Sequence, residues 1–239
     1  MNNTQLAGIT QKAKSQNTAT SEALKSQVKP IVSYSGTQQN ELLAALPRQD
    51  LEEMFDHLEL VAMPFGKELF EYGSKLEYVY FPTTAIVSLL YVMEDGATTE
   101  IAVVGHEGAV GVSLFMGERA TCSAVVQSAG YGYRLRTQYL RDAFNRGGAL
   151  PQLLMRYTNA LFAQMAQNAV GGRHSSIEQK LCRWLLDRLD RSASNELKVT
   201  QELISIMLGV RRESITAAAG KLQDEGLIQY RRGNITVLD

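Results

Sequence analysis

The chain contains only two cysteines and no long apolar run. Cys122 and Cys182 lie far apart without C-x-x-C spacing, so cysteine alone cannot build a zinc site or an iron–sulfur cluster within one chain. We expect both to be buried structural thiols. No segment approaches the ~18 to 20 apolar residues that span a bilayer, and the first residues lack the apolar core of a signal peptide. We therefore expect a cytoplasmic protein with no membrane partner.

Features of an enzyme or a metalloprotein are also scarce. The three histidines, His57, His106 and His174, are scattered, and no carboxylate pair, Ser/His/Asp set or metal-spaced cluster stands out. The stretch 105–108 (G-H-E-G) lacks the second histidine of a zinc hydrolase motif. We therefore expect no catalytic residue, no metal and no bound cofactor.

The net charge is only −1, which excludes a globally basic nucleic-acid binder. A local positive patch remains open, because attraction to phosphate depends on local rather than total charge. Basic residues outnumber acidic ones between positions 211 and 232. Charge alone does not separate a DNA-binding patch from an ordinary solvated face, so the motif beneath the charge has to decide.

The residue pattern changes twice between the N-terminus and about position 135. Residues 1–36 are polar and predict a flexible tail, and residues 40–60 show helical periodicity interrupted at Pro47. From position 61 to about 135, short apolar runs alternate with turns, which predicts an antiparallel barrel or sandwich. Asp95-Gly96 between two such runs indicates a hairpin.

Helical periodicity returns after position 135. A short helix is expected over 136–144, and Pro151 suits the first turn of a longer helix that runs to about Val170. Gly171-Gly172 then indicates a hinge. One face of the long helix carries Leu150, Leu154, Tyr157, Leu161, Met165 and Asn168. This face either packs on the barrel or pairs with its own copy in a dimer.

Another amphipathic helix is expected from Ser175 or Ser176 to about Asp190, followed by a polar loop over 192–196. From Thr200 to Asp239 the pattern is helix, tight turn, helix and hairpin. Thr200 suits an N-cap, Gly209 suits the left-handed residue of a sharp turn, and Gly226 suits the end of the second helix. The residues expected inside are Leu203, Ile204, Met207 and Leu208 on the first helix and Ile215, Ala218, Ala219 and Leu222 on the second.

The outer face of that second helix has the chemistry of a base reader. It carries Arg211, Arg212, Glu213, Ser214 and Thr216. Arginine can bond guanine bidentately, and glutamate accepts a hydrogen bond from the cytosine amino group. Residues 228–238 predict a two-stranded wing with basic residues at its tip, which usually lies along the phosphate backbone. The sequence therefore predicts a DNA-binding transcription regulator with a C-terminal winged helix-turn-helix.

At these residues the chain resembles the Crp/Fnr family, named for the cyclic-AMP receptor protein and the fumarate–nitrate reduction regulator. The resemblance covers about residues 38–239. It implies an α+β protein with an N-terminal antiparallel β-roll of the cyclic-nucleotide-binding (jelly-roll) type, a long dimerisation helix and the winged helix-turn-helix. The implied divisions are a tail (1–36), the β-roll sensor domain (37–148), the dimerisation helix and hinge (149–172) and the DNA-binding domain (173–239).

The resemblance also implies roles for single residues. Arg212 and Glu213 match base-contacting positions of the family, and Thr216 lies beside them. Ala217 stands where the family often has arginine, so the resemblance implies a weaker or different readout there, for which an alanine offers apolar contact with a thymine methyl. The residues expected to contact phosphate are Thr200, Arg211, Ser214, Lys221, Arg231 and Arg232. The residues expected at the two-fold axis are Leu154, Tyr157, Leu161, Met165 and Asn168.

The effector half departs from the family pattern. Cyclic-nucleotide binders carry G-E-[LIV], whose glutamate binds the ribose, and R-[ST]-A, whose arginine binds the cyclic phosphate. Residues 119–121 (R-A-T) resemble the second element, but residues 108–110 (G-A-V) have alanine in place of the glutamate. We therefore expect a degenerate pocket whose effector is unknown and is not cyclic AMP. Its candidate residues are Glu107, Arg119, Ala120 and Thr121.

The resulting hypothesis is a homodimer that binds a palindromic operator, with half-sites about one helical turn, ~34 Å, apart. Double-stranded DNA and a second copy of the chain are the expected partners, and RNA polymerase is a candidate partner. The alternative is a cyclic-nucleotide or other small-molecule sensing module that regulates a partner protein. Arg212 and the basic wing favour DNA, because such a module has no need of them.

Overall fold

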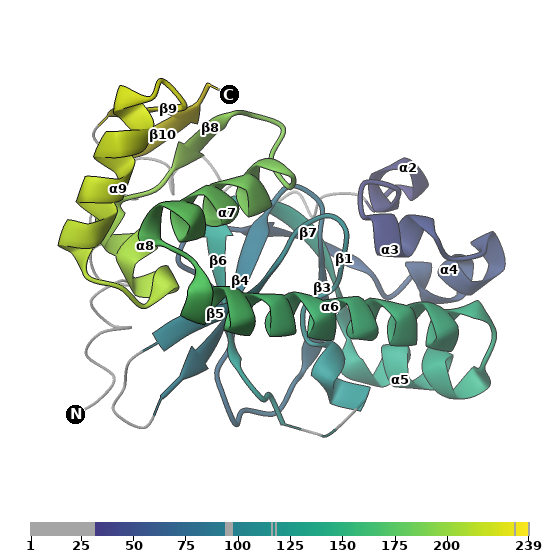
Figure 1. Ribbon diagram of the computed structural model, residues 1–239. Coiled ribbons are helices and arrows are strands. Elements are labelled where there is room, and N and C mark those ends of the chain that lie inside the picture. The colour runs from purple at the N-terminus through teal and green to yellow at the C-terminus, as the bar shows by residue number, and fades with distance from the viewer. Residues whose placement is uncertain (1–31, 94–97, 116, 118, 232, 239) are drawn as a thin grey trace.

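The computed structural model describes residues 32–93, 98–115, 117, 119–231 and 233–238. It consists of an antiparallel β-roll, a long helix and a C-terminal helix-turn-helix with a small sheet (Figure 1). The predicted α+β class and the predicted order of its parts are confirmed.

Within the described residues, three short helices precede the roll: α2 (Tyr34–Thr37), α3 (Glu41–Ala44) and α4 (Arg48–Phe55). Ser33 caps α2 by accepting a hydrogen bond from the Gly36 amide. The tail prediction is therefore wrong for its last residues, because local capping orders them. Residues 1–31 lie outside the described ranges.

The roll is made of two antiparallel sheets, with strand orders β1-β7-β3 and β2-β6-β4-β5. The strands are β1 (Glu59–Met63), β2 (Glu68–Phe70), β3 (Tyr78–Pro82), β4 (Ile86–Val92), β5 (Thr98–Val104), β6 (Ser123–Ser128) and β7 (Gly130–Arg136), with a 3₁₀ turn η1 (Val112–Phe115) before β6. Strands β4 and β5 pair with each other as the predicted hairpin requires. The Asp95-Gly96 turn itself lies outside the described residues.

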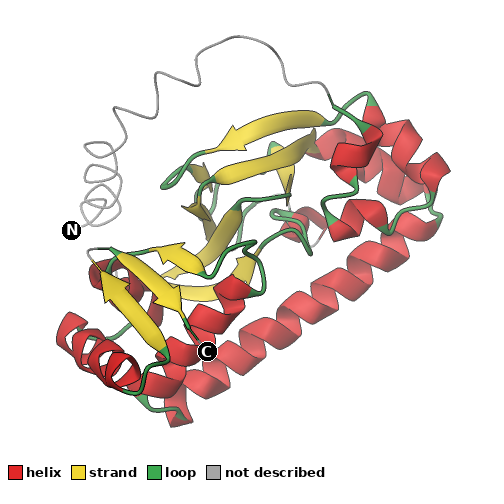
Figure 2. Ribbon diagram, turned by 90° about the horizontal axis from the view of Figure 1, so that it is seen from above, coloured by secondary structure: helices red, strands yellow, loops and turns green. Residues whose placement is uncertain are grey.

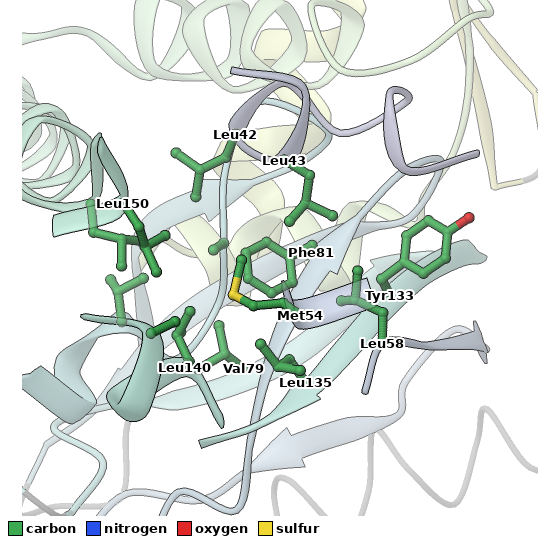
Figure 3. Packing of buried hydrophobic residues seen from close by; sticks show 14 of the residues in the cluster. Leu42, Leu43, Met54, Leu58, Val79, Phe81, Tyr133, Leu135, Leu140 and Leu150 are labelled. Carbon is green, nitrogen blue, oxygen red and sulfur yellow. The ribbon is translucent and has the colours of Figure 1, made fainter. Parts of the chain in front are cut away.

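One core lies between the sheet β1-β7-β3 and the helices around it (Figure 3). Strand alternation sends Val79 and Phe81 of β3 and Tyr133 and Leu135 of β7 into this core. The helices contribute Leu42, Leu43, Met54, Leu140 and Leu150. The other face of the strands encloses a second core inside the roll. Cys122 lies in that second core, and burial raises the pKa of its thiol to about 11.

Helix α5 (Thr137–Arg146) leads into α6 (Ala149–His174), the long helix that runs beside the roll in Figure 2. The predicted end near Val170 is wrong, because α6 continues through Gly171 and Gly172. A glycine costs a helix only about 1 kcal/mol relative to alanine, so the flanking turns carry the helix past the pair. No helix in the described ranges combines the length and apolar content of a membrane span.

The predicted seam of α6 packs on the roll of its own chain. Leu154 is only 1% exposed in the first core, and Leu161 and Met165 pack against the second. Tyr157 donates a hydrogen bond to the Ala109 carbonyl oxygen (3.0 Å), and Asn168 donates one to Ile101 (3.1 Å). Of the two alternatives for this face, packing on the barrel is the one observed within this chain, and it leaves Tyr157, Leu161, Met165 and Asn168 half-buried.

The last part of the chain begins with α7 (Ile177–Leu189), which Ser176 caps with a capping box. It continues through β8 (Glu196–Lys198), α8 (Gln201–Leu208), α9 (Arg212–Asp224), β9 (Ile228–Arg231) and β10 (Asn234–Val237). Strand β8 pairs with β10, so the wing belongs to a three-stranded sheet rather than the predicted two-stranded one. The expected loop over 192–196 ends one residue early, because a three-residue strand carries too little periodicity to be recognised.

Candidate DNA interface and effector site

The helix-turn-helix is built as its sequence predicts. The Thr200 hydroxyl accepts a hydrogen bond from the Leu203 amide (3.2 Å) and caps α8. Gly209 ends α8 in the left-handed region at φ 62°, where any other residue type except asparagine or aspartate would be strained. This turn sets α9 across α8, and Ile215, Ala218 and Ala219 fill the space between them.

The opposite face of α9 is open. Arg212 and Glu213, in its first turn, are exposed, and Ala217 is exposed one turn later. No hydrogen bond or ion pair to any described residue holds the Arg212 side chain. Arg211, the N-cap residue, uses no side-chain bond to cap the helix. The N-cap and first turn of α9 therefore present to solvent a carboxylate and two guanidinium groups that no described residue engages. These are the groups that read guanine and cytosine edges and bind phosphate.

Thr216 is more constrained than its sequence position suggests. Its hydroxyl donates to the Gln201 side-chain oxygen (2.8 Å) and lies 3.1 Å from the Arg212 carbonyl oxygen. Gln201 opens α8, so this bond ties the outer faces of the two helices together. Sequence reasoning did not single out Gln201, because the bond joins residues that only the helix crossing brings together.

Two of the expected phosphate-binding residues are also engaged. The Lys221 ammonium lies 2.6 Å from a Glu178 carboxylate oxygen on α7. This exposed pair lowers the pKa of Glu178 to about 2, chiefly through the Lys221 hydrogen bond. Ser214 is half-buried, and its amide bonds the Arg211 carbonyl oxygen. A phosphate would have to compete with Glu178 for Lys221, whereas Arg211 has no such competitor among the described residues.

Arg231 ends β9 and is exposed at the tip of the wing, where Gly233 adopts φ 85° to turn the chain. Arg232 lies outside the described residues. We propose that Arg231 contacts the phosphate backbone rather than bases, as basic residues at the tip of a wing usually do.

Replacing Arg231 with alanine should therefore weaken binding to all DNA sequences about equally. The slope of log K against log salt should fall by about 1, because one phosphate contact and its released counterion are lost. Fluorescence anisotropy with specific and random duplexes at several salt concentrations measures both quantities. A loss confined to one sequence would contradict the assignment.

The four candidate effector residues do not form one site. Glu107 turns toward the C-terminal part of the chain, where its carboxylate lies 2.7 Å from Arg191 Nε. Arg119 is exposed and donates to the Gly73 carbonyl oxygen (2.8 Å). Ala120 is buried in the first core, and Thr121 is exposed. The prediction that Glu107 belongs to the pocket is wrong, because its carboxylate is already paired.

Tyr157 takes the space next to the degenerate G-A-V element. A Cβ atom built on Gly108 would lie 2.4–2.5 Å from atoms of the Tyr157 ring. The Tyr157 hydroxyl binds the Ala109 carbonyl oxygen, and burial raises the pKa of this phenol. Ala109, in the position of the ribose-binding glutamate, is only 1% exposed in the core. The helix α6 thus covers the element that binds the ribose in cyclic-nucleotide binders.

Adding a methyl group at this contact should destabilise the protein. We expect Gly108→Ala to lower the free energy of unfolding by about 1–3 kcal/mol, because the well-packed ring cannot move aside. Gly117→Ala is the control, since a Cβ there meets no atom of the described residues within 4 Å. Urea denaturation compares the two variants, and equal midpoints would show that Tyr157 does not require glycine at position 108.

Metal ligands do not gather in the described ranges: no three His, Cys, Asp or Glu side chains there lie close enough to hold an ion. His106 instead lies 3.4 Å from Glu41. Sequence reasoning also missed Gln201, Arg188 and Arg191, whose side-chain bonds join different elements of the fold. A signal existed for Arg188, which follows Leu181, Trp184 and Leu185 at helical spacing on the buried face of α7.

Comparison with protein families agrees with this division of the chain. Residues 61–146 match the cyclic nucleotide-binding domain, and residues 179–239 match the Crp-like helix-turn-helix domain. A sensor domain of this type joined to this DNA-binding domain defines a DNA-binding transcription regulator. The chain belongs to the Crp/Fnr family.

Individual relatives are distant. The chain is 23% identical over 192 residues to the "Global nitrogen regulator" of Synechococcus elongatus, covering 76% of this chain and 86% of that protein. Its fold is similar to that of a Crp/Fnr-family regulator from Eubacterium rectale (TM-score 0.66, 17% identity, 84% and 95% of the two chains). It is also similar to that of FixK2 from Bradyrhizobium japonicum (TM-score 0.66, 16% identity, 76% and 93%). At these identities the solved structures support the fold alone.

Proposed function

We propose that the protein is a homodimeric, sequence-specific regulator that binds a palindromic operator through α9. Its effector is not cyclic AMP. The observation that carries this proposal is the open first turn of α9, where Arg212 and Glu213 are exposed and project from a helix held by buried contacts on its other side. The wing places Arg231 at its tip, within the same domain, where the phosphate backbone would run.

The exposed face of α6 supports the dimer. Met155, Phe162 and Val170 are 58%, 54% and 63% exposed, although large apolar side chains are usually buried. Met155, Asn159, Phe162, Ala166 and Ala169 recur at spacings of four and three, as in a coiled coil. This seam lies about 100° around the helix axis from the face that packs on the roll, so the same helix can serve both. We propose this seam as the two-fold contact in place of the residues expected from sequence.

The chemistry next to α6 supports an effector other than cyclic AMP. A ribose anchor is missing because Ala109 replaces the glutamate, and Tyr157 fills the adjacent space. Arg119, the candidate phosphate anchor, bonds the Gly73 carbonyl oxygen on the exposed side of the roll. A cyclic nucleotide would need Tyr157 to leave its buried position and would gain only one charged contact in return.

Binding-site selection from a pool of random double-stranded DNA tests the proposed function. We expect enrichment of an inverted repeat whose half-sites are centred about one helical turn, ~34 Å, apart. Added cyclic AMP should change neither the motif nor the affinity. A selected pool without a common motif, or with a single unrepeated half-site, would refute the palindromic homodimer.

A further inference from the structure

The DNA-binding domain is packed on the roll of its own chain. Leu90 of β4 and Val125 of β6 belong to the same apolar cluster as α7, α8 and α9, and α8 contacts β5 (Figure 1). Gln127 of β6 also contacts Met207 of α8, with its nitrogen 3.9 Å from the sulfur. The domain is therefore seated on the sheet β2-β6-β4-β5, not merely tethered to it through α6.

A buried ion pair crosses this contact. Arg188 of α7 lies 2.5 Å from a carboxylate oxygen of Glu100 on β5, and the two side chains are 5% and 8% exposed. Ser88 of β4 donates a second hydrogen bond to the same Glu100 oxygen. The Arg188 guanidinium stacks 3.5 Å from the centre of the Trp184 ring, and it donates to the Trp184 carbonyl oxygen (3.3 Å). The pair has partners on both sides of the contact.

A second, partly exposed pair lies beside it. Arg191, three residues after Arg188, forms an ion pair with Glu107. The Glu107 carboxylate also accepts hydrogen bonds from the Gly105 amide (3.1 Å). Arg191 in addition donates to the Asp187 carbonyl oxygen (2.5 Å), which holds its side chain along α7. Arg188 of α7 and Arg191, two residues after α7 ends, are therefore both anchored on the segment that begins in β5 and continues into the 105–110 loop.

Such a pair determines geometry more than it adds stability. A buried ion pair gains little over apolar side chains of the same size, but it tolerates only arrangements in which both charges keep their partners. The helix α6 adds a second constraint, since it continues without a break to His174 and the α7 cap follows two residues later. The position of α9 relative to the roll and to α6 is thus specified at two points.

We infer that Glu100 and Arg188 are positioning residues that set the distance between the two recognition helices, and so the half-site spacing that the dimer accepts. The inference rests on the proposed function. The α6 seam places the roll relative to the two-fold axis, and the Glu100–Arg188 pair places α9 relative to the roll. One inserted base pair moves a half-site by ~3.4 Å along the axis and turns it by about a tenth of a helical turn. A DNA-binding domain held to the roll by the Glu100–Arg188 pair cannot follow this shift of the half-site. A domain without the pair can.

The test measures binding of the full-length protein to duplexes that carry the selected half-sites at spacings one and two base pairs longer or shorter. The wild type should prefer one spacing by about tenfold or more, the size of a single lost base contact. Glu100→Gln, which removes the charge and keeps the shape, should reduce that preference to about threefold or less while the base preference within each half-site stays the same. Glu59→Gln is the matched control, because its pair with Arg134 lies within the roll.

A double variant guards against misfolding. Glu100→Met with Arg188→Met replaces the pair by apolar side chains of similar length, which buried sites often tolerate, and it should also relax the spacing preference. Trp184, the single tryptophan of the chain, reports the contact directly: its acrylamide quenching should increase in both variants and not in Glu59→Gln.

Each outcome decides a different question. Unchanged spacing preference in both folded variants would overturn this inference and leave the proposed function intact. Loss of base preference within the half-sites would also overturn it, because the pair would then support the fold of α9 rather than its placement. A wild type that enriches no palindrome would refute the proposed function itself.

Discussion

Phe162→Glu is expected to convert the protein to a monomer and to abolish operator binding at nanomolar concentrations. Phe162 is 54% exposed at the centre of the proposed α6 seam, where a two-fold contact would bring two introduced carboxylates together without a counter-ion. A monomer binds one half-site at a time and loses the effective concentration of the second, which is worth about 10²- to 10⁴-fold in affinity. Sedimentation velocity and operator titration measure the two effects.

Gln167→Glu is the matched control, because Gln167 is exposed on the same helix but lies off the seam. It should remain dimeric and bind the operator. Circular dichroism should show that both variants keep their helix content, since neither side chain is buried in the chain's own cores. A Phe162→Glu protein that still sediments as a dimer would place the two-fold contact elsewhere.

Arg212→Ala is expected to remove sequence preference at one position of each half-site. Bidentate contact of an arginine with guanine is worth about 1–3 kcal/mol of discrimination, and a symmetric dimer makes the contact twice. The fold should not change, because Arg212 is exposed and no described residue pairs with its side chain. Binding-site selection with the variant should return the wild-type motif with one base pair of each half-site randomised.

The contrast with Arg231→Ala makes this result specific. Loss of a phosphate contact lowers affinity for every sequence and leaves the motif unchanged, whereas loss of a base contact changes the motif. An Arg212→Ala protein that selects the wild-type motif would show that Arg212 contacts the backbone, and the base-reading role would then pass to Glu213 or Arg211.

The helix-turn-helix could be predicted from the sequence because its determinants are local. The Thr200 cap, the left-handed Gly209 and the apolar stripes of α8 and α9 act within a few residues of each other. The alternation of short strands likewise indicated an antiparallel barrel or sandwich, and the strands do pair antiparallel in two sheets. The exposure of Arg212 and Glu213 follows from the same periodicity, since the buried residues of α9 leave only one face free.

The role of α6 could not be predicted, because apolar and small residues occur around most of its circumference. Its periodicity predicted one buried face, made of Leu154, Tyr157, Leu161, Met165 and Asn168. Periodicity shows that a face is buried, but it does not show whether the roll or a second copy of the chain covers it. The position of the roll decided that this face is internal. The residues left outside, including Phe162, became the candidate two-fold contact only by that exclusion.

The sequence by itself therefore determined the class of protein and predicted which face of α9 is exposed, because caps, turns and helical periodicity depend on neighbours in the chain. Only the tertiary structure showed which face of α6 is exposed. It also showed that Glu107 pairs with Arg191, and that Arg188 and Glu100 join the two domains. Those contacts bring together residues separated by about a third of the chain. Pairing over such distances depends on how whole sheets and helices pack, which no local pattern of residues encodes.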